Sequence, residues 1–234
     1  MSLDERKQTL LEAVVKEHIR TAKAVGSSHL VEKYRFHLSP ATIRHEMMDL
    51  ENEGYLTHRH TSAGRIPTEK GYRFFIDNLL EEKELNLQHK AVLQKTYKDT
   101  KDSLIRIKNL AKMVAHLSHE AVLIGFAPQD VYYTGLTNVF RQPEFSQIDL
   151  VYSLSEVVDH LDEAMEEIFN EVTPEIKILV GKENPFGRGC SVILTKYSHY
   201  RVGEGLLGIL GPMRMDYNNN QALVKYTQEL ISNI

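Results

Sequence analysis

Apolar residues recur at intervals of three and four positions through most of the first 80 residues, which is the period of amphipathic helices. The spacing predicts a first helix over 3–25 and a short second helix over 27–35. A third helix follows over 39–53, and a fourth over 68–80. Between the last two, a polar stretch rich in turn-forming residues interrupts the pattern. The order helix, helix, turn, helix, hairpin is that of a winged helix-turn-helix domain.

The third helix has clear signals at both ends. Ser39 is a preferred N-cap, Pro40 suits the first turn, and Gly54 can close the helix with a positive φ. The stripe that must be buried carries Ile43, Met47 and Leu50. The opposite side offers small, donor-bearing and methyl-bearing groups, a set suited to base edges in a DNA major groove: Ser39, Ala41, Thr42, Arg44, His45 and Met48. Taken alone, an ordinary amphipathic surface helix fits equally well. A separate acidic stripe, which would have to tilt away from phosphate, comprises Glu46, Asp49 and Glu53.

A basic hairpin directly after the third helix favours nucleic acid. Between Tyr55 and Arg73, Lys and Arg outnumber the acidic residues, although the whole chain has a net charge of −4. Such a hairpin is placed to hold phosphates or to enter the minor groove. The candidate wing residues are His58, Arg59, His60, Thr61, Ser62, Gly64 and Arg65. Lys70 and Arg73, on the predicted fourth helix, are interpreted as solvated. The alternative is that they support the wing in binding phosphate.

The stretch 81–118 is highly charged and contains neither Gly nor Pro. It carries a series of positions alternating four and three apart, which predicts one connecting helix. The seam includes Leu93, Tyr97, Leu104, Ile107 and Val114. This seam can pack on the same helix of a second subunit, or equally well on another part of the same chain.

Beyond Ser118 the pattern changes to short apolar runs, which are typical of buried strands. The predicted strands are 121–127, 131–134, 176–181, 191–196 and 205–210, with 135–147 expected to be a loop. Ser153 and Glu156 match a capping box that opens a helix to about Asn170, and Asp216 precedes a closing helix. The expected fold over 119–234 is a small α+β domain with a mostly antiparallel sheet.

Composition sets the class of protein. At 234 residues and 42% hydrophobic content, the chain can bury a core in one or two domains. It has no run of 18 apolar residues and no apolar segment near its N-terminus, so we expect a cytoplasmic protein. A single cysteine, Cys190, fits a reducing compartment. The net negative charge means that affinity for nucleic acid must come from a local basic patch.

The sequence offers no convergent nucleophile, base and stabiliser, so we expect no enzyme. Cys190 lies beside Ser191, where a buried strand is predicted to begin, and is interpreted as an inert core thiol. His58-x-His60 and His116-x-x-His119 lack the partners of a metal site, and the glycine spacings do not match a nucleotide-binding loop, so no metal and no cofactor are expected. Arg214 and Asp216 are expected to form a local ion pair.

The run HTSAGRIPT followed by KGYR resembles the N-terminal signature of the heat-inducible transcription repressor family HrcA. The second half resembles the same family at TGLTNVFRQPEF, VGKENP, CSVILTKY and GILGPMRMDY. The chain has His45 where the family usually has Asn, and Met213 where it usually has Thr. Family members are usually longer, and the missing length, which includes an inserted dimerisation segment, is expected between Pro128 and Val131.

The resemblance implies a winged helix-turn-helix DNA-binding domain over 1–80, a connecting or dimerisation helix over 81–118, and a GAF-like regulatory domain over 119–234. It further implies a homodimer that represses chaperone operons by binding double-stranded DNA at the inverted repeat called CIRCE. Release under heat stress is expected, with the GroEL chaperonin keeping the repressor active. The alternative is a ligand-sensing or protein-interaction module that uses the winged helix for protein contacts.

Overall fold

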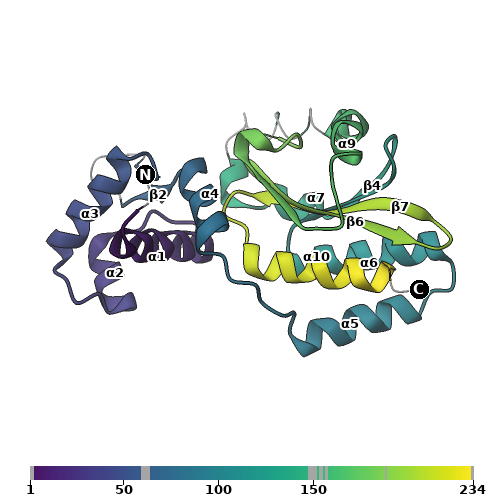
Figure 1. Cartoon of the computed structure of the whole chain (residues 1–234), viewed down its shortest axis with the longest axis horizontal. Helices are drawn as coiled ribbons and strands as arrows, with labels where there is room; N and C mark the ends of the chain where they lie inside the picture. The colour runs from purple at the N-terminus through teal and green to yellow at the C-terminus, as the bar shows by residue number, and fades with distance from the viewer. Residues whose placement is uncertain are drawn as a thin grey trace. The chain divides into compact units, whose positions relative to one another are not determined.

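The computed structural model describes residues 3–58, 64–146, 152, 155, 158–187 and 189–232. The chain divides into two compact units, Met1–Glu81 and Glu82–Ile234. Figure 1 shows the helices of the first unit and the sheet with its helices in the second. Each unit is described by itself below.

The first unit consists mainly of helices with one short hairpin. Its elements are α1 (Glu5–Thr21), α2 (Ser27–Tyr34), α3 (Pro40–Asn52), β1 (Leu56–Thr57), β2 (Ile66–Pro67) and α4 (Glu69–Asn78). The predicted caps of α3 and α4 are confirmed: the side chain of Ser39 accepts from the Thr42 amide, and that of Thr68 accepts from the Gly71 amide. Gly54 has a φ of +79°, as the end of α3 requires.

The core of the first unit comes from one face of each helix. The predicted stripe of α3 is buried against the apolar face of α1 and against α2 and β1. The buried residues include Leu10, Leu11, Val14 and Val15 of α1, Leu30 of α2, Ile43, Met47 and Leu50 of α3, and Tyr72 and Phe75 of α4. Packing of these faces leaves the opposite side of α3 exposed.

The hairpin is attached to the turn between α1 and α2. β1 and β2 pair antiparallel, and Val25 forms an isolated antiparallel bridge with Arg65 through two backbone hydrogen bonds of 2.8 and 2.9 Å. A Cβ on Gly64 would lie 2.3 Å from the Val25 carbonyl oxygen. Glycine is therefore required at position 64 for the hairpin to approach this turn.

The second unit is a five-stranded sheet with helices. Its strands are β3 (Ala121–Ala127), β4 (Asp130–Thr134), β5 (Lys177–Val180), β6 (Cys190–His199) and β7 (Gly203–Pro212). Its helices are α5 (Leu87–Lys98), α6 (Ser103–Ser118), α7 (Leu136–Phe140), α9 (Leu161–Phe169) and α10 (Tyr217–Ser232), with short 3-10 turns η1 (Pro143–Ser146) and η2 (Gly181–Glu183).

The strands pair antiparallel in the order β4-β3-β7-β6-β5, which confirms the predicted α+β fold class. Figure 1 shows α10, α6 and α5 on one side of this sheet and α9 on the other. The α9 side holds an apolar cluster in which Met165 and Phe169 of α9, Val139 of α7 and Phe145 of η1 pack with strand residues such as Leu123. The three central strands, β3, β7 and β6, are buried on both faces over most of their length, which explains their nearly continuous apolar sequences.

The prediction of one helix over 81–118 is wrong. The chain is not helical before Leu87, and α5 ends at Lys98 before α6 begins at Ser103. Asn86 and Asp102 cap the two helices, accepting from the amides of His89 and Ile105. α5 packs on α6 and both helices pack on α10, so most of the predicted seam makes contacts within the chain. Leu93, Ile107 and Val114 are buried, and the Tyr97 hydroxyl receives a hydrogen bond from Arg106. Leu104 remains 47% exposed.

Two smaller expectations for the second half also need correction. The expected loop over 135–147 contains α7 and η1, because Val139 and Phe145 reach the apolar cluster. Arg214 does not pair with Asp216; its guanidinium binds Glu144 and Gln142, and Asp216 accepts from the Asn219 amide at the start of α10. The capping box at 153 and 156 lies outside the described residues.

Candidate nucleic-acid interface

The side of α3 predicted to read bases is open to solvent. Ala41, Thr42, Arg44 and His45 are exposed, and Met48 is 43% exposed. Ser39 is exposed at the N-terminus, where its hydroxyl lies 2.9 Å from that of Thr42 and caps the helix. Arg44 and His45 follow one turn later. The first two turns of α3 therefore present donors and short side chains together, as a helix entering a groove by its N-terminal end requires.

The acidic residues of α3 pair with basic residues of α1. Arg6 lies 2.6 Å from the carboxylate of Glu46, which is 5% exposed. Lys7 donates to Glu53 at 2.7 Å and lies 3.7 Å from Asp49. The predicted acidic stripe thus faces α1, and Glu46 belongs to the interior. These pairs partly cancel the negative charge that would otherwise repel phosphate near Arg44.

Glu51, near the end of α3, fastens the base of the hairpin. Its carboxylate accepts from Nδ1 of His58 and, at 2.7 Å, from Nε of Arg65. Because the Arg65 side chain is 18% exposed and its backbone bonds to Val25, the structure gives His58 and Arg65 a role in attaching the wing to α3. The sequence did not predict this role of Glu51, because the spacing of apolar and polar residues does not show that its side chain contacts residues after the turn.

Of the remaining predicted wing residues, the structure describes only Gly64. Gly64 is explained by its close approach to the Val25 backbone. Arg59, His60, Thr61 and Ser62 lie outside the described residues. The residues that flank this gap are attached to α3 through the contacts of His58 and Arg65 with Glu51.

Lys70 and Arg73 of α4 are not simply solvated. The Lys70 ammonium donates to the carbonyl of Glu53 at 2.7 Å and lies 4.2 Å from the centre of the Tyr55 ring. It thereby satisfies a carbonyl at the C-terminus of α3, where a positive charge is favourable. Arg73 pairs with Asp77 on its own helix at 3.3 Å.

A buried carboxylate that the sequence did not reveal ties α1 to α2. Glu17 is 2% exposed and accepts from Arg20 at 2.6 Å, from His29 at 2.8 Å and from the Lys33 ammonium. The hydrogen bond from Arg20, together with those from Lys33 and His29, lowers the pKa of the Glu17 carboxyl to about 2 despite its burial. Since α2 supports α3, this carboxylate helps to position the exposed helix.

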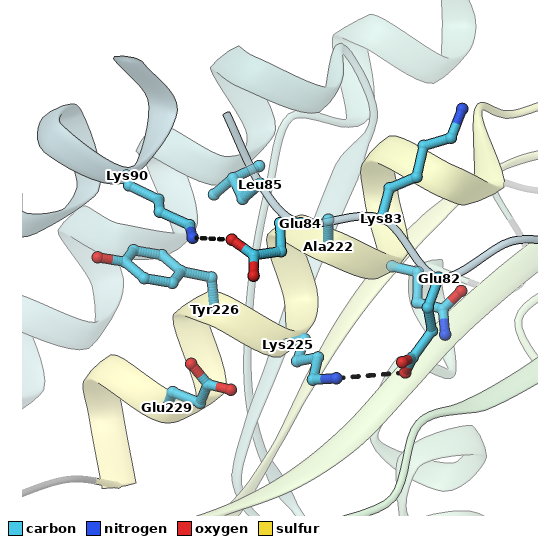
Figure 2. A pocket seen from close by; sticks show the side chains of 10 residues that line it. Glu82, Lys83, Glu84, Leu85, Lys90, Ala222, Lys225, Tyr226 and Glu229 are labelled. Atoms are coloured by element: carbon cyan, nitrogen blue, oxygen red, sulfur yellow. Dashed lines mark hydrogen bonds and ion pairs between the residues drawn. The ribbon is translucent and has the colours of Figure 1, made fainter. Parts of the chain in front are cut away.

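The second unit has a cavity of about 310 Å³ between the segment before α5 and α10 (Figure 2). Lys90 donates to Glu84 at 2.9 Å, and Lys225 donates to Glu82 at 3.2 Å, so two ion pairs fasten this segment. Most lining side chains are charged; Leu85 and Ala222 supply apolar surface. Sites for small organic molecules are mostly apolar, and this cavity lacks that character.

The isolated chemical candidates are buried or dispersed. Cys190 is 1% exposed, and burial raises the pKa of its thiol to about 12, as expected for an unreactive core cysteine. In the described part of the chain, no group of three or more His, Cys, Asp or Glu residues could hold a metal ion. None of the helices within those residues is long and apolar enough to cross a membrane.

The family model and the curated relatives point to one family. A family model described as the HrcA protein C-terminal domain matches residues 72–220. The heat-inducible transcription repressor HrcA of Carboxydothermus hydrogenoformans is 27% identical over 337 aligned positions, covering 99% of this chain and 98% of the relative. The protein of the same name from Desulforudis audaxviator is 26% identical, covering 100% and 98%. A crystal structure of a hypothetical protein at 2.2 Å resolution shares the fold, with a TM-score of 0.75 at 19% identity and coverage of 99% and 98%.

A winged helix-turn-helix unit with one exposed side of α3, followed along the chain by an α+β unit, is an arrangement typical of transcription regulators. The match to the family model and the relatives that align over the whole chain specify the family. The chain belongs to the HrcA family, whose curated relatives are named heat-inducible transcription repressors. The alignments run over 337 positions whereas this chain has 234 residues, so it is a shorter form. β3 and β4 pair up to Ala127 and Asp130, leaving a tight turn at the place where the missing segment was expected.

Proposed function

We propose that this protein is a DNA-binding transcriptional repressor in which α3 reads the major groove and the hairpin contacts the backbone or the minor groove. The observation that carries the proposal is the exposed first half of α3, with Arg44 and His45 outside and the acidic side chains paired elsewhere. The names of the full-length relatives support a repressor of transcription. Thr42, Arg44 and His45 would contact base edges, and Arg59 would contact phosphate.

Substitution of Arg44 separates reading of bases from attraction to phosphate. Arg44→Ala should cost about 1–3 kcal/mol of binding free energy and relax base preference at one position of the half-site. Arg59→Ala should weaken all duplexes alike and reduce the salt slope by about 1. Titration of a CIRCE-type duplex and a scrambled duplex at two salt concentrations measures both effects. Arg141→Ala, an exposed arginine of the second unit, serves as the control. Equal behaviour of the Arg44 and Arg59 variants on both duplexes would contradict this division.

The natural target of such a helix is an inverted repeat bound by a homodimer. Two-fold symmetry in the protein would match two half-sites about one helical turn or a multiple apart. The seam of α5 and α6 is mostly occupied within the chain, so it gives this proposal little support. Sedimentation of the full chain with and without operator duplex tests it: a mass of two chains per duplex is expected, and one chain per duplex would refute it.

Release on heating follows if the operator binds the folded repressor, since unfolding then removes it from the DNA. We further propose that a GroEL-type chaperonin maintains the folded form and that the regulated operons encode chaperones. The relatives are named heat-inducible, which supports this part. Operator affinity measured after mild heating, with and without chaperonin and ATP, is the test; equal recovery in both samples would exclude the chaperonin.

The cavity in Figure 2 is the observation that would favour the alternative, a ligand-sensing module. Four of the charged side chains that line it form two ion pairs with one another, and it lies beside the segment before α5 rather than at the sheet. Repression therefore remains the better-supported function. A mobility shift that does not distinguish the CIRCE-type duplex from a scrambled one would reverse that preference.

A further inference from the structure

Glu120 is a buried carboxyl group that the proposed function does not use. It lies between α6 and β3, is 5% exposed, and its Oε2 atom has no hydrogen-bond partner among the described residues. The carboxyl fills the space left by Gly211 of β7, where a Cβ would come within 2.4 Å of Oε2. Burial raises the pKa of Glu120 to about 8; the charge of Arg214 opposes this shift and that of Glu144 adds to it.

Arg214 fastens η1 to the end of the sheet. Its Nη2 donates to Gln142 at 2.6 Å and to Glu144 at 3.1 Å, and its Nε donates to the other oxygen of Glu144. At the opposite end of this segment, the Asn138 amide donates to the carbonyls of Ala115 and Glu120 at 3.1 and 3.2 Å. The stretches TGLTNVFRQPEF and GPMRMDY, prominent in the sequence, thus meet around one buried acid.

Arg214 binds Glu144 directly and acts on Glu120 through its charge, and these two carboxyl groups differ in their access to water. The Glu144 side chain is 23% exposed, so its carboxylate can be solvated if it leaves Arg214. A charged Glu120 has no such option, because its side chain is enclosed by the sheet. An ionised Glu120 would also repel Glu144. Charge on Glu120 therefore favours transfer of the guanidinium from Glu144 to Glu120.

We propose that Glu120 is a proton-controlled switch that holds or releases the segment 135–146. While its carboxyl is neutral, Arg214 binds Glu144 and Gln142 and the segment stays fixed. When the carboxyl ionises, Arg214 turns to it and η1 loses its anchor. The charged or titratable groups acting on Glu120 are Arg214 after β7, Glu144 of η1 and Cys190 of β6. The thiol of Cys190 stays neutral in this range, while α7 presents the uncharged Asn138.

Hydrogen exchange of the full chain tests this switch at two reporter amides. The amide of Gln142 donates to Val139 and that of Phe145 donates to Gln142, at 2.9 and 3.0 Å. After correction for the intrinsic pH dependence of exchange, their protection should fall as the pH rises toward about 8, by at most about tenfold per pH unit, and level off above that pH. Glu120→Gln should keep the protection constant over this range. Glu171→Gln, which removes an exposed carboxylate after α9, should behave as wild type.

Three results would overturn the proposal. The first is protection of the wild-type amides that does not change with pH. The second is a Glu120→Gln protein that keeps the wild-type pH dependence. The third comes from Glu144→Gln, which should show low and pH-independent protection; if it instead loses protection in parallel with the wild type, Arg214 does not couple the two carboxyl groups. The third variant leaves the buried position intact, so it remains informative if Glu120→Gln fails to fold.

Discussion

Glu17 is expected to be among the most costly polar residues to replace in the first unit. Glu17→Gln removes the charge and brings an amide donor toward side chains that are themselves donors: Arg20, His29 and Lys33. The change should loosen α2 from α1 and, through α2, disturb the support of α3.

The shift in pKa sets the size of the effect. A change from 4.5 to about 2 corresponds to about 3.4 kcal/mol at 1.36 kcal/mol per unit. The side chains that donate to Glu17 are 36 to 60% exposed, so solvent screening reduces this value, and we expect a loss of about 2 kcal/mol at neutral pH. The pKa is lower in the folded state. The stabilisation is therefore fully present above pH 4.5 and is lost as the pH falls toward 2.

Native-state hydrogen exchange of α2 amides, such as that of Leu30, measures this free energy within the full chain. Glu12→Gln is the matched control, since Glu12 is on the same helix and pairs with Lys16 one turn away; it should cost less than about 0.5 kcal/mol. The difference between wild type and Glu17→Gln should shrink as the pH approaches 2. A difference that is equal at neutral and acidic pH, or no larger than that of Glu12→Gln, would refute the reasoning.

Two further substitutions test the packing that positions the wing and the seam. Gly64→Ala places a Cβ 2.3 Å from the Val25 oxygen and should lower the free energy of unfolding by about 1–3 kcal/mol. Gly26→Ala is the control, because a Cβ there has nothing within 4 Å, and it should be tolerated. Urea unfolding and hydrogen exchange of the Val25 amide measure the difference between the two variants. Leu93→Ala should lower the free energy of unfolding by about 2–5 kcal/mol, because it leaves a cavity between α5 and its neighbours. Leu87→Ala, at an 82% exposed position, should change the unfolding midpoint little. Equal effects of the two substitutions would contradict the placement of α5.

Local signals in the sequence sufficed where the structure is determined by neighbours along the chain. The limits of α3 followed from Ser39, Pro40 and Gly54, because caps act within one turn. The strand runs followed from buried apolar residues. The break at 99–102 carried a local signal too, the cap Asp102, but the regular spacing of apolar residues concealed it.

The candidate site was only partly predictable, because its charges are set by tertiary contacts. The exposure of Arg44 and His45 followed from the periodicity of one helix. The partners of Glu17 lie 3 to 17 positions away, and Glu51 binds a residue 14 positions later. A sequence pattern does not show which of many Lys, Arg and His residues will approach a given carboxylate.

The electrostatic potential around α3 depends on basic residues of α1, and one of these, Lys7, can affect DNA binding without contacting DNA. Lys7 neutralises Glu53 and lies near Asp49, so Lys7→Ala should leave negative charge on α3 while the base-reading side chains stay in place. Operator affinity should fall several-fold at low salt, and the deficit should shrink as salt rises, because screening weakens fields between exposed charges. Lys95→Ala, an exposed lysine of α5, is the control. If affinity falls equally at low and high salt, the lysine acts through folding of α1 against α3, and the electrostatic explanation of the acidic stripe is wrong.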